Sequence, residues 1–241
     1  MIPKKIHYVW FGGSEKPPET IAFIRGWRSL MPDHEVIEWN ESNINVSSHP
    51  YMQRMYNEGK FAFASDYARL MILRYEGGIY LDTDVELKKS LDPFNTETCF
   101  WSFEFDHFLS TCVIGCEPNQ PVISALMKEY DHLEKEIVNN TLVTKYFIKH
   151  FPEFRLNNKD QVVGGNIRIF PKEYFVVPAF GTSRNFSVHH ADNHWKSERK
   201  DSPIGTAVRA VIGDVLYFKL INLKMGWNDE FRPLEKARRD L

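Results

Sequence analysis

Long apolar runs are missing from this 241-residue sequence. No stretch of about 20 uncharged apolar residues occurs, so no segment has the pattern of a membrane-spanning helix. The first residues, Ile2 to Ile6, include two lysines and no long apolar segment, so no signal peptide is visible. From these two absences we expect a cytoplasmic protein.

Cysteine is scarce as well. The three cysteines, Cys99, Cys112 and Cys116, are an odd number and do not form the framework of a secreted disulfide-rich domain. Cys112 and Cys116 have the spacing of half a zinc site, but no second Cys/His pair with suitable spacing lies nearby. We therefore expect buried free thiols in a reducing compartment.

An excess of basic charge is also absent. The chain has 30 Lys and Arg residues against 32 Asp and Glu residues, which gives a formal net charge of -2. A general nucleic-acid binder would show a basic excess, so nucleic acid is not an expected partner. Hydrophobic residues make up 43% of the chain, enough for a sizeable core. No repeat, low-complexity tract or linker interrupts it, and we expect one domain over residues 1–241.

Apolar runs and helical patterns alternate along the chain. Strands are expected over 6–11, 35–39, 79–81, 100–103 and 111–115, and helices from 17, over 62–75, 121–138 and 206–225. Short strands and loops are expected over 157–193, and the tail over 232–241 is charged. The β-α-β order at the start predicts an α/β fold, a Rossmann-like mixed sheet flanked by helices.

Two aspartates follow the predicted strand 79–81. Asp82 and Asp84, separated by Thr83, stand at its carboxyl end, where open α/β sheets bind their ligands. Paired carboxylates suit Mg²⁺ or Mn²⁺, which bind through oxygen together with substrate phosphates. Such an ion neutralises a diphosphate as it leaves. Taken alone, an Asp-x-Asp pattern is also common in solvated surface turns.

Three segments resemble one family. Residues 64–85 read ASDYARLMILRYEGGIYLDTDV, residues 5–13 read KIHYVWFGG, and residues 189–195 read HHADNHW. Together they resemble the sugar-binding region of the family-32 glycosyltransferases, the large clostridial glucosylating toxins and capsular polysaccharide glycosyltransferases. His194 replaces a serine of the family's last element. The resemblance implies a GT-A fold, a nucleotide-sugar donor and retention of the anomeric configuration.

The resemblance also implies roles for single residues. Asp84 would bind the metal, Mn²⁺ or Mg²⁺, and Asp82 would contact the metal, the ribose or both. Asp66 and Arg69, at i and i+3 on one helix, would reach the donor and complete the catalytic set. The alternative for this pair is an ion pair on the helix surface.

Four more residues follow from the same comparison. Trp10 would stack on the nucleobase and Val9 would offer backbone contacts, although a core position would also suit Trp10. Trp195 would donate its indole N–H to a phosphate oxygen. His190 is the candidate third metal ligand, with His189 as the alternative, since neighbours in an extended segment point to opposite sides. Independently of the resemblance, Glu104 and Asp106 follow the end of a predicted strand, and one of them could face the acceptor or the anomeric carbon, with a solvent-facing acidic loop as the alternative.

These residues and the resemblance together predict a metal-dependent glycosyltransferase that moves a hexose to a glycan or lipid-linked acceptor in polysaccharide synthesis. The resemblance alone implies that it is a retaining enzyme and that the hexose is UDP-linked by preference. Alternatives are a toxin-type protein glycosyltransferase, a nucleotidyltransferase, which would need a Gly-rich phosphate loop, and a nucleotide-sugar-binding module without turnover. The apolar helix with Arg209, Lys219 and Lys224, followed by the basic tail with Arg232, Lys236, Arg238 and Arg239, allows weak peripheral contact with the inner face of a membrane, driven mainly by the charge of the tail. A helix packed on the sheet is the favoured interpretation of that segment.

Overall fold

The computed structural model describes residues 1–178, 183–190, 213–227 and 230–239. Its centre is a seven-stranded mixed sheet with the order β2-β1-β3-β6-β5-β8-β7, and a second sheet pairs β4 with β9. The strands are β1 (Lys5–Val9), β2 (Glu35–Trp39), β3 (Gly78–Leu81), β4 (Val85–Leu87), β5 (Cys99–Phe105), β6 (Phe108–Cys116), β7 (Gln161–Val163), β8 (Ile167–Phe170) and β9 (Ser187–His189). The helices are α1 (Pro18–Leu30), α2 (Pro50–Asn57), α3 (Phe61–Glu76), α4 (Pro121–Glu129), α5 (Asn139–His150), α6 (Lys172–Phe175), α8 (Asp214–Trp227) and α9 (Phe231–Arg239).

The first strands form the predicted β-α-β arrangement. β1 pairs in parallel with β2 on one side and with β3 on the other. α1 begins with Pro18 at its first turn, where the missing N–H of proline costs nothing. α3 ends at Glu76 and is followed by Gly77, whose φ of +62° favours glycine. β3 then pairs antiparallel with β6, which pairs antiparallel with β5. The predicted α/β fold with a mixed sheet is confirmed.

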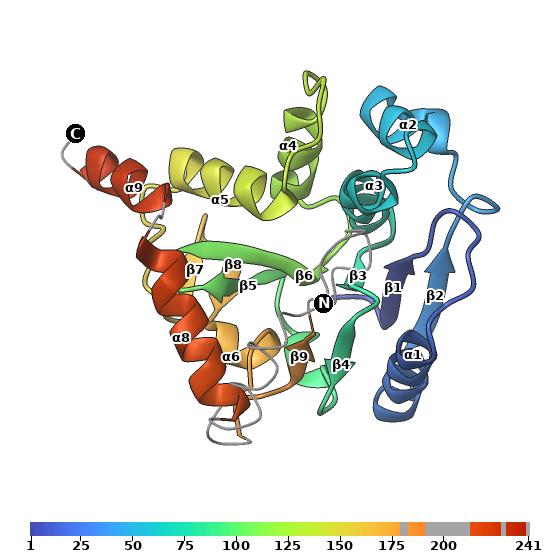
Figure 1. Ribbon diagram of the computed structural model, residues 1–241, viewed down its shortest axis with the longest axis horizontal. Coiled ribbons are helices and arrows are strands. Elements are labelled where there is room, and N and C mark those ends of the chain that lie inside the picture. The colour runs from blue at the N-terminus through green and yellow to red at the C-terminus, as the bar shows by residue number, and fades with distance from the viewer. Residues whose placement is uncertain (179–182, 191–212, 228–229, 240–241) are drawn as a thin grey trace.

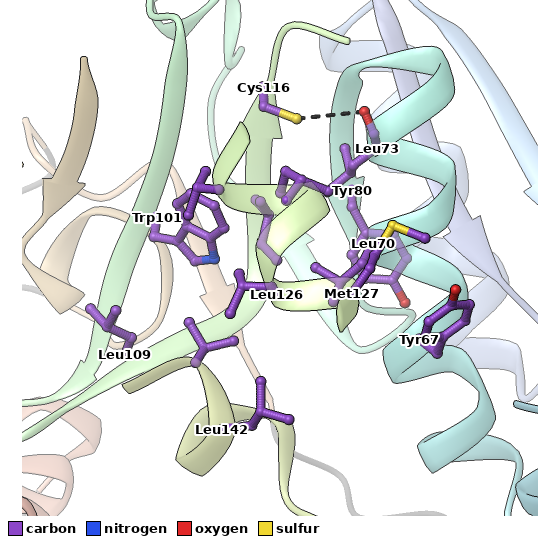
Figure 2. Packing of buried hydrophobic residues seen from close by; sticks show 14 of the residues in the cluster. Tyr67, Leu70, Leu73, Tyr80, Trp101, Leu109, Cys116, Leu126, Met127 and Leu142 are labelled. Carbon is purple, nitrogen blue, oxygen red and sulfur yellow. Dashed lines mark hydrogen bonds between the residues drawn. The ribbon is translucent and has the colours of Figure 1, made fainter. Parts of the chain in front are cut away.

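Helices cover both faces of the central sheet (Figure 1). On one face α2, α3, α4 and α5 contribute to a hydrophobic cluster, and Figure 2 shows Leu70 and Leu73 of α3 and Leu126 and Met127 of α4 among its members. The other face carries a second cluster, which includes Trp27 of α1 and side chains of α6. The sheet is therefore buried on both sides, and its strand ends are left for a site.

The chain after α4 departs from the predicted helix over 121–138. α4 ends at Glu129, because the following segment is held by tertiary contacts instead of helical ones. Arg54 of α2 donates to the carbonyl oxygens of Leu133 and Glu134, and the buried Tyr130 hydroxyl donates to Asn139, the first residue of α5. These contacts turn the chain so that a separate helix, α5, can pack beside β6.

The C-terminal part also differs from its prediction. Of the expected helix over 206–225, residues 206–212 lie outside the described residues, and α8 begins after Gly213. The charged tail forms the helix α9, whose Phe231 is buried in the core. As expected, Cys99, Cys112 and Cys116 are buried free thiols. Among the described helices, none combines the length and apolar character that spanning a bilayer requires.

His7 ties β1 to the turn before β3. The Trp39 indole N–H donates to His7 Nδ1 at 3.0 Å, so Nε2 carries the proton and donates to the Gly77 carbonyl oxygen at 2.9 Å. Burial lowers the pKa of His7 from 6.5 to about 4, against the raising effect of the Gly77 hydrogen bond. The folded protein therefore disfavours the imidazolium, which would turn Nδ1 into a second donor facing Trp39.

We expect a pH dependence of stability from this histidine. Because the pKa of His7 is lower in the folded chain than in the unfolded chain, its contribution is complete above about pH 6.5 and is lost as the pH falls towards 4. The free energy of unfolding should fall by about 2 kcal/mol from this residue between pH 7.5 and 5. Urea unfolding at both values should show that loss in the wild type and not in His7→Gln. Equal pH dependence in the two proteins would contradict the assignment.

Candidate functional site

Both aspartates of the Asp-x-Asp element lie where the chain passes from the large sheet to the small one. Asp82 directly follows β3, and its backbone N–H donates to the Cys112 carbonyl oxygen of β6 at 2.9 Å. The N–H of Val85 returns to the Asp82 carbonyl oxygen at 3.0 Å, which closes a tight turn around Asp84. The turn therefore presents two carboxylates at the carboxyl end of β3, between β1 and β6.

A histidine from a distant part of the chain joins them. β9 pairs antiparallel with β4, with His189 opposite Val85. His189 Nε2 lies 3.3 Å from Asp84 Oδ1, and ligand atoms of Asp82, Asp84 and His189 all lie within 4.8 Å of one another. The three side chains keep 24%, 20% and 15% of their surface exposed. Two carboxylates and one imidazole fit Mn²⁺, and with less preference Mg²⁺.

His190, the histidine preferred from the sequence, has a different position. Its Nε2 lies 3.0 Å from Glu86 Oε2, and its ring stacks on Phe23 of α1 with centroids 5.0 Å apart. Its backbone N–H donates to the Asp84 carbonyl oxygen. Because successive side chains of an extended segment point to opposite sides, the side chain of His190 is directed away from that of His189. His189, the alternative weighed from the sequence, is the histidine that lies beside the aspartates, and which of the two binds a metal stays a prediction.

Arg69 of α3 links Asp66 to Asp82. Its Nη2 donates to Asp66 Oδ1 at 2.6 Å, and its Nη1 lies 3.1 Å from Asp82 Oδ1 and donates to the Thr111 carbonyl oxygen at 2.9 Å. The Tyr80 hydroxyl donates to Asp82 Oδ1 at 3.2 Å. Arg69 is only 4% exposed. The pair is no surface ion pair, because it forms a buried network that holds one carboxylate of the turn in place.

Burial and charge shift the ionisation of this network. Burial raises the pKa of the Asp66 and Asp82 carboxyls, while the Arg69 guanidinium opposes the rise in both. Burial lowers the pKa of His189, but the negative charge of Asp84 and then of its other neighbours outweighs this and raises it well above the ordinary value. Negative charge is thus concentrated around His189, as a cation site requires.

Glu104 of β5 lies behind this histidine. Its Oε1 is 3.4 Å from His189 Nδ1, and its other oxygen accepts a hydrogen bond from the Ser110 hydroxyl. A carboxylate beside Nδ1 favours the tautomer that carries its proton on Nδ1, and this leaves the Nε2 lone pair facing Asp84. Asp106, the other acidic residue weighed from the sequence, forms an ion pair with Lys172 instead. The sequence placed Glu104 near a strand end but held no signal that it meets His189.

The predicted nucleobase residues lie at the end of β1. Val9 is buried, and Trp10 is partly buried beside the cluster that contains Trp27. The Trp10 indole N–H donates to the Ser14 carbonyl oxygen at 2.8 Å, and Lys16 Nζ lies 5.4 Å from the ring centroid. Because β1 runs parallel to β3, its carboxyl end is at the same edge as Asp82. Trp195 lies outside the described residues.

Parts of this chain are similar to known proteins. A family model described as the glycosyltransferase sugar-binding region containing the DXD motif matches residues 17–101. An uncharacterized glycosyltransferase of Acanthamoeba polyphaga mimivirus is 29% identical over 174 residues, covering 66% of this chain and 68% of that protein. Inositol phosphoceramide mannosyltransferase 3 of Schizosaccharomyces pombe is 31% identical over 96 residues, covering 38% of this chain and 27% of that protein.

A solved structure agrees in fold. The PaToxG glycosyltransferase is 21% identical to this chain and superposes with a TM-score of 0.54, covering 63% of this chain and 70% of that one. Its likeness concerns the arrangement of the mixed sheet and its helices, which is the GT-A fold. The Asp-x-Asp turn at the carboxyl end of β3 falls inside the matched sugar-binding region. Residues 17–101 of this chain therefore match the DXD-containing sugar-binding region of glycosyltransferases, and the chain has the GT-A fold.

Proposed function

We propose that this protein is a metal-dependent, retaining glycosyltransferase that moves a hexose from a nucleotide-sugar to a glycan or lipid-linked acceptor. One observation carries the proposal: the side chains of Asp82, Asp84 and His189 converge within 4.8 Å at the carboxyl edge of the sheet. Carboxylates beside an imidazole suit Mn²⁺ better than Mg²⁺. When bound, the ion would supply charge neutralisation for a departing nucleoside diphosphate.

The protein's own residues prepare this site. Asp84 and His189 would hold the ion, with Asp82 as a further ligand or a contact to the donor ribose. Arg69 and Asp66 fix the orientation of Asp82 through their buried ion pair, and Glu104 fixes the ring of His189. Groups held before the donor arrives need no reorganisation during the reaction, and this is the basis of electrostatic catalysis.

The donor and the acceptor are proposed from the family. UDP is the expected nucleotide, with its base near Val9 and Trp10 and with Trp195 toward its phosphates. Retention of configuration and a role in polysaccharide synthesis are supported by the resemblance of the motifs. Inositol phosphoceramide mannosyltransferase 3 is named for a membrane lipid, and this supports a lipid-linked acceptor here. Residues 1–241 would act as one domain.

Metal removal tests the proposal directly. We expect EDTA to lower the turnover of UDP-hexoses at least about 100-fold, and Mn²⁺ to restore it more completely than Mg²⁺. Donor hydrolysis, followed as released nucleotide for a panel of nucleotide-sugars, measures this without knowledge of the acceptor. Full turnover in EDTA would overturn metal dependence.

An NMR spectrum of the transferred product should show an α linkage from an α donor, and a β linkage would overturn retention.

The two adjacent histidines provide a matched pair of variants. His189→Gln should weaken Mn²⁺ binding about 10- to 100-fold, because it removes the imidazole 3.3 Å from Asp84. His190→Gln should leave Mn²⁺ binding within about twofold of the wild type, because His190 faces Glu86 and Phe23. Titration of Mn²⁺ followed by electron paramagnetic resonance gives both affinities. The reverse order would return the ligand role to His190.

A further inference from the structure

Helix α8 presents an apolar stripe to solvent. Leu216, Leu220 and Leu223 are 47%, 54% and 69% exposed, although leucine is a residue that folding ordinarily buries. Their spacing of four and three residues places them within about 60° of arc on one side of an α-helix. They therefore form a continuous ridge along the helix, which we call the leucine stripe.

The opposite side of α8 holds the helix on the protein. Phe218 points about 180° away from the stripe by helical geometry, and it packs against the cluster that contains Trp27 and Phe175. Figure 1 shows α8 along the outside of the molecule, near α6 and far from α1 and β2. The favoured sequence interpretation, a helix packed on the sheet, is thus correct for the face that carries Phe218. It does not explain why the leucine face is exposed.

Two lysines border the leucine stripe. Lys219 and Lys224 are both exposed, and helical geometry places one on each side of the leucines, about 40° beyond them. Lysines in these positions can extend their ammonium groups sideways while their methylene stems lie along the apolar surface. An apolar ridge with a cation on either side is complementary to an anionic lipid surface, where leucines enter the acyl boundary and lysines meet phosphates.

We propose that the leucine stripe of α8, with Lys219 and Lys224, attaches this glycosyltransferase to the surface of an anionic membrane. The helix has 14 residues, too few to cross a bilayer, so it would lie in the plane of the interface. A single stripe of three leucines gives reversible attachment, which suits an enzyme that must reach many acceptors. The attachment depends on α8 alone and holds whether or not the acceptor is lipid-linked.

Vesicle co-sedimentation of the full chain tests the proposal. We expect binding to phosphatidylcholine vesicles that contain about 30% phosphatidylserine, and at least tenfold weaker binding to pure phosphatidylcholine. Binding should weaken but persist when NaCl rises from about 50 mM to about 500 mM, because salt screens the lysines and leaves the leucines unaffected. Leu216→Glu/Leu223→Glu and Lys219→Glu/Lys224→Glu should each lower binding to the anionic vesicles at least tenfold.

Controls separate this result from misfolding and from the sugar chemistry. Ile21→Glu, another exposed apolar position (37%) on the distant helix α1, should bind vesicles like the wild type. All variants should keep the wild-type melting temperature and donor hydrolysis in solution. No wild-type binding at low salt, or unchanged binding in the leucine variant, would overturn the proposal. A wild-type dimer that the leucine variant converts to a monomer, without vesicle binding, would instead make the stripe an interface between two copies.

Discussion

Asp84→Asn is expected to lower donor turnover at least about 1,000-fold, which corresponds to about 4 kcal/mol of lost transition-state stabilisation. Asp84 lies in the turn between β3 and β4, and its Oδ1 lies 3.3 Å from Nε2 of His189 in β9. Its carboxylate therefore links the two strands of the small sheet at the site. Asparagine keeps the size of the side chain and one oxygen but removes the negative charge. Because the packing is unchanged, the loss of turnover measures the effect of the negative charge on the metal ligand.

Glu86→Gln is the matched control. Glu86 lies in β4, two residues after Asp84, and is also a carboxylate beside a histidine. It pairs with His190 and Lys88, away from the aspartates. Turnover by this variant should stay within about threefold of the wild type. Donor hydrolysis in saturating Mn²⁺ and thermal melting of each protein decide the matter. A folded Asp84→Asn enzyme with near wild-type turnover would refute the proposed metal site, as would equal losses in the two variants.

Gly78→Ala is expected to destabilise the fold by about 3–5 kcal/mol. Gly78 begins β3 with φ +93°, and a Cβ there would lie 2.7 Å from His7 Nε2 and 2.8 Å from the Lys5 carbonyl oxygen. Neither neighbour can yield easily. Lys5 contributes backbone in β1, and the His7 ring is held by hydrogen bonds from Trp39 and to Gly77. The added methyl would therefore push β1 away from β3, the strand that Asp82 directly follows.

Gly165→Ala separates the steric clash from the cost of a positive φ. Gly165 has φ +79°, yet a Cβ there would meet nothing within 4 Å. Its substitution should cost only about 1–2 kcal/mol, the penalty of the backbone conformation. Urea unfolding of both variants gives the two values, and Gly78→Ala should also lose turnover in proportion to the unfolded fraction. Equal destabilisation of the two variants would show that contact with β1 contributes nothing.

Local sequence patterns were sufficient for β1, α1, β2, α3 and β3, but α2 and β4 were not predicted. β2 has the predicted bounds, and α1 and α3 begin and end within a few residues of expectation, because proline, glycine and apolar spacing act over one or two helical turns. The Asp-x-Asp turn could be placed at a strand end for the same reason. The helix predicted over 121–138 ends at Glu129 instead, and Arg54, far away in sequence, donates to the carbonyl oxygens of Leu133 and Glu134 in the segment that follows it.

What the sequence by itself determined is the chemistry available: two carboxylates after a short apolar strand, an Asp and an Arg on one helix face, and two adjacent histidines near the C-terminus. Tertiary structure decided which of these meet. The pairing of β4 with β9 places His189 opposite Val85, 104 residues earlier in the chain, and a shift of one residue would have exchanged the two histidines. The same holds for Glu104 behind His189 and for the face that α8 turns to solvent. Strand register and helix rotation depend on the whole packed core, and no short stretch of sequence contains that information.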